Sequence, residues 1–379
     1  MAKEKKMVKK DDVKVTDNQK NALDLADMIN SKFKTEIAVA EGGAPKKVPA
    51  ISTGSMLLDV ALGVGGLPQG RIIEIFGPEA SGKTTLTLHL AAEAQSKGMQ
   101  VAFIDAEHAL DPQYAQRIGV KMNELLIVQP DNGEQAFDVA DTLIESGKVQ
   151  VIIIDSVAAL TPQQELEGTM EDQGMGVHAR LMSKGLRRIT AKAAKNNVMV
   201  ILINQLRMKI GVMFGSPETT TGGEALKFYA STRLRVSRTK STIAGADHDK
   251  VGIMKVMIKK NKVSVPFKEC EIPVIFGEGI DQIGETYAFA KEVGIFKTTG
   301  GSHYYKGTGK VTLLSGEELQ NDENDKTNRF ATKGSDAMEE MKKNEKFYQL
   351  VRKQVKEALQ RIVSGEMVLK DEDTKAIEG

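Results

Sequence analysis

The octapeptide at residues 77–84 constrains the fold of this chain more than any other segment. It reads GPEASGKT and matches the pattern of a phosphate-binding loop (P-loop), GxxxxGK[ST], at every fixed position. The apolar run Ile72–Phe76 precedes it, and a helical pattern runs from Lys83 to about Ser96. A glycine-rich turn can match this pattern by chance. A chance match would not be expected to have a strand directly before it and a helix directly after it. The octapeptide therefore predicts a strand–loop–helix unit that binds nucleotide phosphates.

Four short runs in the middle of the chain are rich in β-branched residues and alternate with helical patterns. They are Ile72–Phe76, Val101–Ile104, Val151–Ile154 and Val198–Ile203. Strands buried on both faces of a parallel sheet have this composition, because helices cover both sides. We therefore predict an α/β fold with a P-loop core, in which helices flank a largely parallel central sheet. A later run, Lys227–Val236, alternates in polarity and predicts a half-exposed strand, with another at about Val251–Lys259.

Composition excludes several classes of protein. The chain has 379 residues, of which 41% are hydrophobic and 27% charged, so it can bury a substantial core. Lys and Arg total 52 against 51 Asp and Glu, which excludes a uniformly basic DNA-coating protein but allows local basic patches. The one cysteine, Cys270, fits a reducing compartment. No apolar run approaches the ~20 residues of a membrane span and no signal-peptide core follows the start, so we expect a cytoplasmic protein with no membrane partner.

Shifts in composition predict four parts. Residues 1–50 contain a basic start, an amphipathic helix at about Thr16–Phe33 and a linker with Gly and Pro. Residues 51–279 contain the sheet core. Residues 280–365 form a small α/β C-terminal domain, with a polar insertion after Gly307 and one long amphipathic helix that includes Met338 and Ile362. Residues 366–379 form a disordered, mildly acidic tail.

The P-loop supplies most of the predicted phosphate site, namely Gly77, Pro78, Glu79, Ala80, Ser81, Gly82, Lys83 and Thr84. Its glycines let backbone N–H groups wrap the phosphates without a Cβ clash. We expect Lys83 to neutralise the β- and γ-phosphates and the Thr84 hydroxyl to ligate Mg²⁺. Asp155 ends the run VIIID, where an acidic residue either caps a helix or holds Mg²⁺ through water. Beside a P-loop, we expect the magnesium role.

Hydrolysis of a phosphate ester also needs a group that activates water. Ser156, not a second acid, follows Asp155, so this group must come from elsewhere. Glu107 follows the neighbouring strand and is the predicted general base, although a solvated loop carboxylate is an equal alternative. Asn204 and Gln205 follow the fourth strand, where an amide could sense the γ-phosphate or simply cap the strand.

Two segments are candidates for contact with DNA. Gln205–Leu226 combines the cations Arg207 and Lys209 with apolar residues such as Ile210 and with four glycines. Cations suit phosphates and apolar wedges suit base steps, although a hairpin tucked into the core would have the same composition. The second segment, Glu167–Gly176, is also rich in glycine and leads into a helix. On this helix a basic stripe at i, i+4, i+7 and i+8 forms either a solvated face or a phosphate-binding face: Arg180, Lys184, Arg187 and Arg188.

Several long motifs resemble those of the RecA family of bacterial recombinases. They are ISTGSMLLDVALGVGGLPQGR from Ile51, GPEASGKTTL, FIDAEHALDPQYA, IDSVAALTPQ, INQLRMKIGVMFGSPETTTGG and ALKFYAS. The resemblance covers about Ile51–Gly279 and implies an ATPase core of the RecA type that uses ATP and Mg²⁺. It further implies a filament of many copies on single-stranded DNA, which pairs with a homologous duplex and exchanges strands in recombination and repair. The filament would also stimulate self-cleavage of a LexA-type repressor in the SOS response.

The resemblance assigns roles to further residues. Tyr114 would stack on adenine, Gln205 would couple the γ-phosphate to the DNA loop, and Lys260 and Lys262 would reach the ATP of a neighbouring subunit. Met175 and Ile210 would wedge between base triplets. The residues that would bind the DNA backbone are Arg180, Ser183, Arg187, Gly222 and Gly223. The Thr16–Phe33 helix would dock on the next subunit. Glu224 and Gly185 depart from the family pattern, within the Gln205–Leu226 segment and the basic helix respectively.

Other proteins with a P-loop core remain as alternatives. A hexameric helicase would form closed rings, and a small-molecule kinase would need an acceptor pocket and a lid. A DNA-coating protein could use ATP only as a switch, although Glu107 argues against this reading.

Overall fold

The computed structural model describes residues 17–33, 48–168, 176–208, 218–239, 251–300, 302–320 and 329–363. The chain divides into two units, residues 1–47 and 48–379. The described part of the first unit is α1 (Asp17–Phe33), which confirms the predicted amphipathic helix. Its side chains Leu25, Met28 and Ile29 are exposed. The predicted basic start, most of the predicted linker and the acidic tail lie outside the described residues.

A large sheet forms the centre of the second unit, and its ten described strands follow the order β12-β11-β10-β9-β3-β7-β6-β4-β5, with β8 paired to β7. Six strands form a parallel array: β3 (Ile72–Gly77), β4 (Val101–Asp105), β5 (Leu125–Val128), β6 (Val151–Asp155), β7 (Met199–Met208) and β9 (Thr232–Thr239). The others pair antiparallel: β8 (Glu218–Thr220), β10 (Val251–Asn261), β11 (Glu269–Ile275) and β12 (Gly279–Ile280). The prediction of a largely parallel sheet is confirmed.

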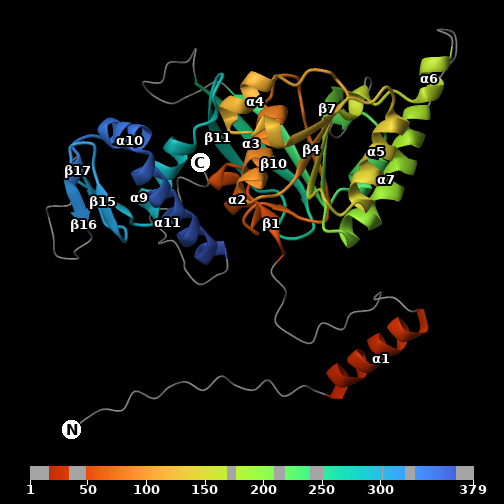
Figure 1. Ribbon diagram of the computed structural model, residues 1–379, viewed down its shortest axis with the longest axis horizontal. Coiled ribbons are helices and arrows are strands. Elements are labelled where there is room, and N and C mark those ends of the chain that lie inside the picture. Colours follow the sequence, from red (N-terminus) through yellow and green to blue (C-terminus); the bar gives the residue numbers. More distant parts are fainter. Residues whose placement is uncertain are drawn as a thin grey trace. The chain divides into compact units, whose positions relative to one another are not determined.

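Helices cover both faces of this sheet because successive residues of each strand point to opposite sides. The helices concerned are α3 (Lys83–Ser96), α4 (Pro112–Ile118), α5 (Gly133–Glu145) and α7 (Val177–Lys195). Phe103 and Ile153 pack in one apolar core with residues of α3 and α4. Ile104 and Ile154, one position further along, pack in a second core with residues of α5 and α7. Figure 1 shows α3 in front of the sheet and α5 and α7 together at its other side.

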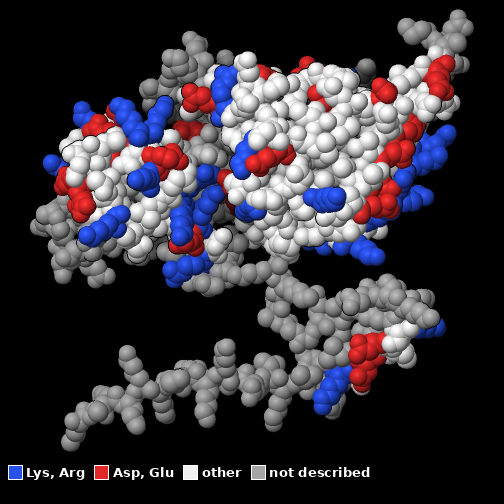
Figure 2. Space-filling model, viewed as in Figure 1, with Lys and Arg blue, Asp and Glu red and all other residues white. Residues whose placement is uncertain are grey.

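The contact between α5 and α7 explains two features of the predicted basic stripe. A Cβ atom on Gly185 would lie 2.5 Å from the ring of Phe137, so glycine lets the two helices approach closely. Arg188 contacts Asp138 and also donates to Asp141 Oδ2 at 2.6 Å. Figure 2 shows acidic side chains running beside basic ones over these two helices. Arg188 is exposed on α7 as the stripe predicts, but the acidic side chains of α5 balance its charge.

The predicted strand Lys227–Val236 is wrong in its first half. Residues Ala225–Tyr229 form a short helix, α8, and the strand β9 begins at Thr232. The N–H of Ala230 donates to the Leu226 carbonyl in a helical turn. Pairing with β3 starts only at Ser231, whose N–H donates to the carbonyl of Ile72. In a continuous strand Phe228 would lie on the same face as the buried Leu234, but on α8 it is 72% exposed.

Small elements complete the second unit. They are β1 (Ala50–Ile51), α2 (Met56–Leu62), β2 (Leu67–Pro68), α6 (Gln163–Glu167), α9 (Gln282–Glu292), β13 (Phe296–Thr299), β14 (Ser302–Tyr305), β15 (Lys310–Thr312), β16 (Glu318–Gln320), β17 (Arg329–Ala331), α10 (Gly334–Lys343) and α11 (Glu345–Val363), with short 3-10 helices at Met122–Glu124 and Val157–Ala159. A third apolar core, around Phe296, Tyr305 and Phe347, joins α9 to α11 with the small strands. No helix within the described ranges is long and apolar enough to cross a membrane.

The single long helix predicted near the C-terminus is in fact two helices. Met338 lies on α10 and Ile362 on α11, and Asn344 separates them. The Asn344 Oδ1 atom accepts from the N–H of Phe347 at 3.1 Å, and its Nδ2 atom donates to the Thr312 carbonyl at 2.8 Å. Asparagine at this position starts a new helix because its side chain replaces a missing backbone partner. Part of the polar insertion, residues 321–328, lies outside the described residues.

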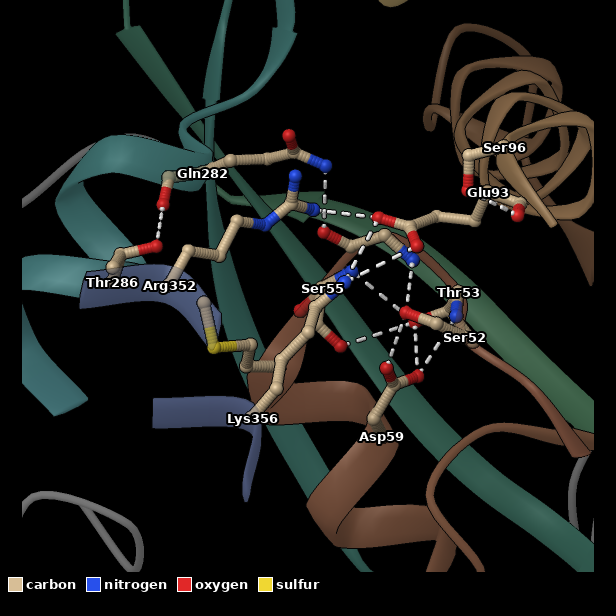
Figure 3. Close-up of polar contacts among 12 residues, drawn as sticks. Ser52, Thr53, Ser55, Asp59, Glu93, Ser96, Gln282, Thr286, Arg352 and Lys356 are labelled. Carbon is tan, nitrogen blue, oxygen red and sulfur yellow. Dashed lines mark hydrogen bonds and ion pairs between the residues drawn. The ribbon is translucent and has the colours of Figure 1, made fainter. Parts of the chain in front are cut away.

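Buried ionic contacts join α11 to α3, the helix that starts at the P-loop (Figure 3). Glu93 of α3 accepts from Arg352 at 2.6 Å and from Lys356 at 3.2 Å. Burial raises the pKa of Glu93, but Lys356 and Arg352 outweigh it and bring the pKa below its ordinary value. One carboxylate on the nucleotide-site helix thus balances two cations of the C-terminal helix.

A second buried carboxylate, Glu285 of α9, caps α2. Its two oxygens accept from the Ser55 hydroxyl at 2.6 Å and from the Met56 N–H at 2.8 Å. Asp59, on α2 itself, accepts from Ser52 and Thr53, as Figure 3 shows. Burial raises the pKa of Asp59 to about 6 and that of Glu285 to about 8.

We predict that Glu93→Gln lowers the free energy of unfolding by about 1–3 kcal/mol, because it leaves two cations without their shared counter-charge. Urea unfolding, followed by circular dichroism, measures this change. The matched control is Glu339→Gln, since Glu339 contacts Lys343 on α10 where both side chains are exposed. The control should change stability by less than about 0.5 kcal/mol. Equal effects of the two substitutions would contradict a buried contribution from Glu93.

We also predict a pH dependence of stability that originates at Glu285. Because the folded-state pKa is raised from 4.5 to about 8, the stability linked to this proton is complete below pH 4.5 and is lost as the pH rises through about 8. Asp59 acts in the same direction at lower pH. Urea unfolding between about pH 5 and about pH 9 should show a steeper loss in the unmodified protein than in Glu285→Gln, by more than about 1 kcal/mol. Parallel curves would refute this assignment.

Candidate functional site

The P-loop connects β3 to α3 as the sequence predicts. Its backbone conformation requires glycine at two positions. A Cβ atom on Gly77 would lie 1.9 Å from the Val236 carbonyl oxygen of β9. Gly82, which precedes the first residue of α3, has φ +97°, a left-handed conformation that favours glycine. Both glycines are therefore required by the structure as well as by the pattern.

Lys83 lies over the loop that precedes it. Its Nζ atom donates to the carbonyls of Gly77 at 3.2 Å and Pro78 at 2.7 Å. Burial lowers the pKa of Lys83, while the nearby carboxylates of Asp155, Glu107 and Glu79 oppose this change. The ammonium group is thus held at the loop, where a phosphate would replace the carbonyls as its partner.

Two oxygen groups that suit magnesium meet beside Lys83. The Thr84 hydroxyl donates to Asp155 Oδ2 at 2.8 Å, and burial raises the pKa of Asp155 to about 6. Among the described residues, no group of three or more His, Cys, Asp or Glu side chains could hold a metal ion by itself. Mg²⁺ is commonly held by one or two carboxylates together with substrate phosphates. The buried Ser81 hydroxyl, which has no hydrogen-bond partner in the described part of the chain, also fits a loop built for a polar ligand.

Glu107 lies close to this site, on the loop that follows β4. Its N–H and that of Ala106 donate to the Asp155 carbonyl at 3.3 and 2.9 Å. Its Oε1 atom accepts from the Ser156 hydroxyl and from Gln205 Nε2, the latter at 3.3 Å. The structure therefore brings together the predicted general base and the predicted sensor amide.

Asp105, to which sequence reasoning assigned no role, holds the loop that carries Glu107. Its carboxylate is buried and accepts from the N–H groups of Ala109 and Leu110 at 3.1 and 3.3 Å. It also accepts from Gln129 Nε2 at 3.3 Å. The signal was available, since Asp105 ends its strand just as Asp155 does.

Tyr114 borders a cavity of about 280 Å³ next to the P-loop. Its hydroxyl is 2.8 Å from the Thr85 hydroxyl. The opposite wall includes Arg238 and Phe276, and the Arg238 guanidinium lies 4.2 Å from the centre of the Phe276 ring. Sequence reasoning did not single out this wall, because β9 and β11 are far from the P-loop in the sequence.

Lys260 and Lys262 lie at the other end of β3 from the P-loop. Lys260 pairs in register with Arg233, near the first residues of β3, and the N–H of Lys262 donates to the Ser231 carbonyl. The Lys260 ammonium donates to the carbonyls of Lys227 and Phe228 at 2.7 and 3.1 Å. The structure does not bring these lysines to the P-loop of their own chain.

The two candidate DNA segments meet at α7. Gly222 and Gly223 have φ +84° and +75°, and Cβ atoms there would lie 3.0 Å from Met182 and 2.9 Å from Ala179. Arg180 and Arg187 are exposed on the same helix, and Ser183 is half-buried. Exposed Arg207 lies on β7, where it pairs with Thr219 of β8. The two ends of the Gln205–Leu226 segment therefore pair as a β-hairpin, and residues 209–217 between them lie outside the described residues.

Three predicted DNA-binding residues lie outside the described residues: Met175, Lys209 and Ile210. Glu224, the departure from the family pattern, contacts Lys227 at 2.6 Å. Part of its negative charge is thus balanced within the chain.

Comparisons with known proteins find a matching family and several similar chains. A family model described as "RecA N-terminal domain" matches residues 19–281. "Protein RecA" of Cereibacter sphaeroides is 57% identical over 259 residues, which is 68% of this chain and 75% of that protein. "Protein RecA" of Thioalkalivibrio sulfidiphilus is 52% identical over 294 residues, or 77% and 85%. A solved structure, of the RadB recombinase, covers 61% of this chain and 98% of its own, at 22% identity and a TM-score of 0.47.

Proposed function

This chain belongs to the RecA family, and from that membership we propose that it is a recombinase with a role in DNA repair. In detail, we propose a DNA-dependent ATPase that assembles on single-stranded DNA, pairs it with a homologous duplex and exchanges the strands. We further propose that the filament stimulates self-cleavage of a LexA-type repressor. The contact between Glu107 and Gln205 carries the ATPase part of the proposal, because it joins a carboxylate at the P-loop to the hairpin that leads to the DNA segment.

At the nucleotide site, each proposed role follows from a side chain described above. The backbone N–H groups of residues 79–84 and the Lys83 ammonium bind the phosphates, and Tyr114 borders the base. Thr84 and Asp155 would hold Mg²⁺, which when bound reduces the negative charge on the phosphates. Glu107 accepts a proton from the attacking water, and Gln205 orients the Glu107 carboxylate.

A second copy of the chain is proposed to complete the site. Lys260 and Lys262 lie away from the P-loop of their own chain, and in this proposal their cations reach the nucleotide of a neighbour. The exposed apolar side chains of α1 would dock on that neighbour. Such an interface joins two different patches of the chain and therefore builds an open filament if the rotation does not close.

We predict that Glu107→Gln retains binding of ATP and of single-stranded DNA but lowers ATP turnover more than about 100-fold, because the amide cannot accept the proton. Steady-state hydrolysis, with nucleotide binding measured separately, tests this outcome. The control is Glu124→Gln, at an exposed ion pair with Lys121. Normal turnover in Glu107→Gln would reject the assignment of the base.

A mixing experiment tests the shared site. Glu107→Gln and a Lys260→Ala, Lys262→Ala double variant should each be inactive alone. When they are mixed in equal amounts, random assembly puts an intact Glu107 opposite intact lysines at about a quarter of the interfaces, so activity should recover to about that fraction. Absence of recovery, with filaments seen by electron microscopy, would mean that the lysines do not act on a neighbour's nucleotide.

A further inference from the structure

Asn204 lies within β7, opposite Phe76 near the end of the parallel pairing with β3, and it is fully buried and uses all of its hydrogen-bonding capacity. Its Nδ2 atom donates to Glu74 Oε1 at 3.0 Å and to the Thr221 carbonyl at 3.1 Å. Its Oδ1 atom accepts from the Gln205 N–H at 2.9 Å and from the Thr221 hydroxyl at 2.5 Å. Two donors and two acceptor positions are all that an asparagine side chain offers.

The chemistry of these contacts requires an amide of this length. An aspartate has no N–H to donate, and a longer or shorter side chain would not reach the same four partners. Because the group is buried, loss of one contact leaves a polar atom unsatisfied, which costs more than the contact itself contributes. The orientation of the Asn204 amide is therefore fixed by its neighbours.

Thr221 is held to Asn204 by both its carbonyl and its hydroxyl. It directly follows β8, which pairs with β7 from Leu206 to Met208, and it directly precedes Gly222 and Gly223. Those glycines pack on α7, beside the exposed arginines. A displacement of the glycine segment is thus passed to Asn204 by two hydrogen bonds.

Glu74 holds the other side of the amide. It lies on β3, three residues before the P-loop glycine, and is fully buried. Its second oxygen contacts Arg233 of β9, whose guanidinium also lies 4.6 Å from the centre of the Phe76 ring. A buried carboxylate is tolerated when it is paired and hydrogen-bonded, and Arg233 and Asn204 supply these contacts to Glu74.

We propose that Asn204 is a positioning residue that couples the Thr221–Gly223 segment to the Glu107 carboxylate through Gln205, with the Glu74–Arg233 ion pair as its fixed support. Gln205 receives this coupling at its backbone N–H, and its side chain contacts Glu107 at 3.3 Å. The inference rests on the proposed function, in which DNA binds near Gly222 and Gly223 and Glu107 activates water. Neither Asn204 nor Thr221 touches the reacting groups themselves.

The test is a matched set of substitutions in one short segment. Thr221→Val keeps the shape and the carbonyl but removes the hydroxyl that donates to Asn204, and Thr221→Ser restores a hydroxyl. Thr220→Val is the control, because the Thr220 hydroxyl is buried without a hydrogen-bond partner among the described residues. ATP turnover is measured with and without a single-stranded oligonucleotide, and KM for ATP is determined for each variant.

Thr221→Val should reduce the stimulation of turnover by the oligonucleotide about tenfold, since one net hydrogen bond of the coupling is lost. Turnover without DNA and KM for ATP should change less than about twofold, and both Thr221→Ser and Thr220→Val should behave as the unmodified protein. A merely structural role would instead change KM and DNA-free turnover together. Equal stimulation in Thr221→Val and Thr220→Val would overturn the proposal.

A second readout keeps this inference separate from the proposed function. Hydrogen exchange of the backbone at residues 204–208 without DNA should be about fivefold faster in Thr221→Val than in Thr220→Val, because the Asn204 amide loses a partner. If the unmodified protein shows no DNA-stimulated turnover, the proposed function is wrong, whereas the exchange result still decides whether Thr221 holds Asn204. Identical exchange in the two variants would overturn the coupling.

Discussion

Burial of the parallel strands on both faces is the constraint on which the rest of the structure depends. Where helices cover both sides of a sheet, a strand interior accepts apolar side chains, and polar chemistry is confined to the strand ends. The carboxyl ends of β3, β4 and β6 lie at one edge, as in other open α/β sheets, and Gln205 of β7 lies opposite Gly77 at the end of β3. The P-loop, Glu107, Asp155 and Gln205 therefore gather there although they are far apart in the sequence.

Three buried carboxyl groups of the second unit are informative because each has polar or charged partners. Glu74 is the exception within a strand, and Arg233 and Asn204 balance it. Glu93 joins α3 to α11 through two cations, and Glu285 caps α2 from α9. Removing one member of such a set is costly, because it leaves its partner desolvated without compensation. These contacts accordingly connect the nucleotide helix and the sheet to segments that lie far away in the chain.

Sequence patterns predicted correctly those elements that a local pattern of residues specifies. The four buried strands and the P-loop helix agree with the structure within a few residues, since a run of β-branched residues or a glycine pattern acts locally. The patterns failed where a distant partner decided the outcome. Alternation at 227–236 suggested a strand, yet sheet pairing with β3 begins only at Ser231. Arg188 lies in the predicted basic stripe, but only the structure shows that acidic side chains of α5 balance its charge.

The same distinction applies to the candidate site, where some features follow from local sequence and others from contacts between distant segments. The sequence by itself determined the phosphate loop, the acidic residue at the end of β6 and the apolar strands, because these depend on local backbone conformation and hydrophobic periodicity. It left Glu107 and Gln205 as open alternatives and did not single out Asp105, Arg238 or Phe276. Only the tertiary structure decided that Gln205 contacts Glu107, that Asn204 joins Thr221 to Glu74, and that Lys260 lies away from its own P-loop. Those contacts depend on strand order and register, which bring together side chains from distant segments.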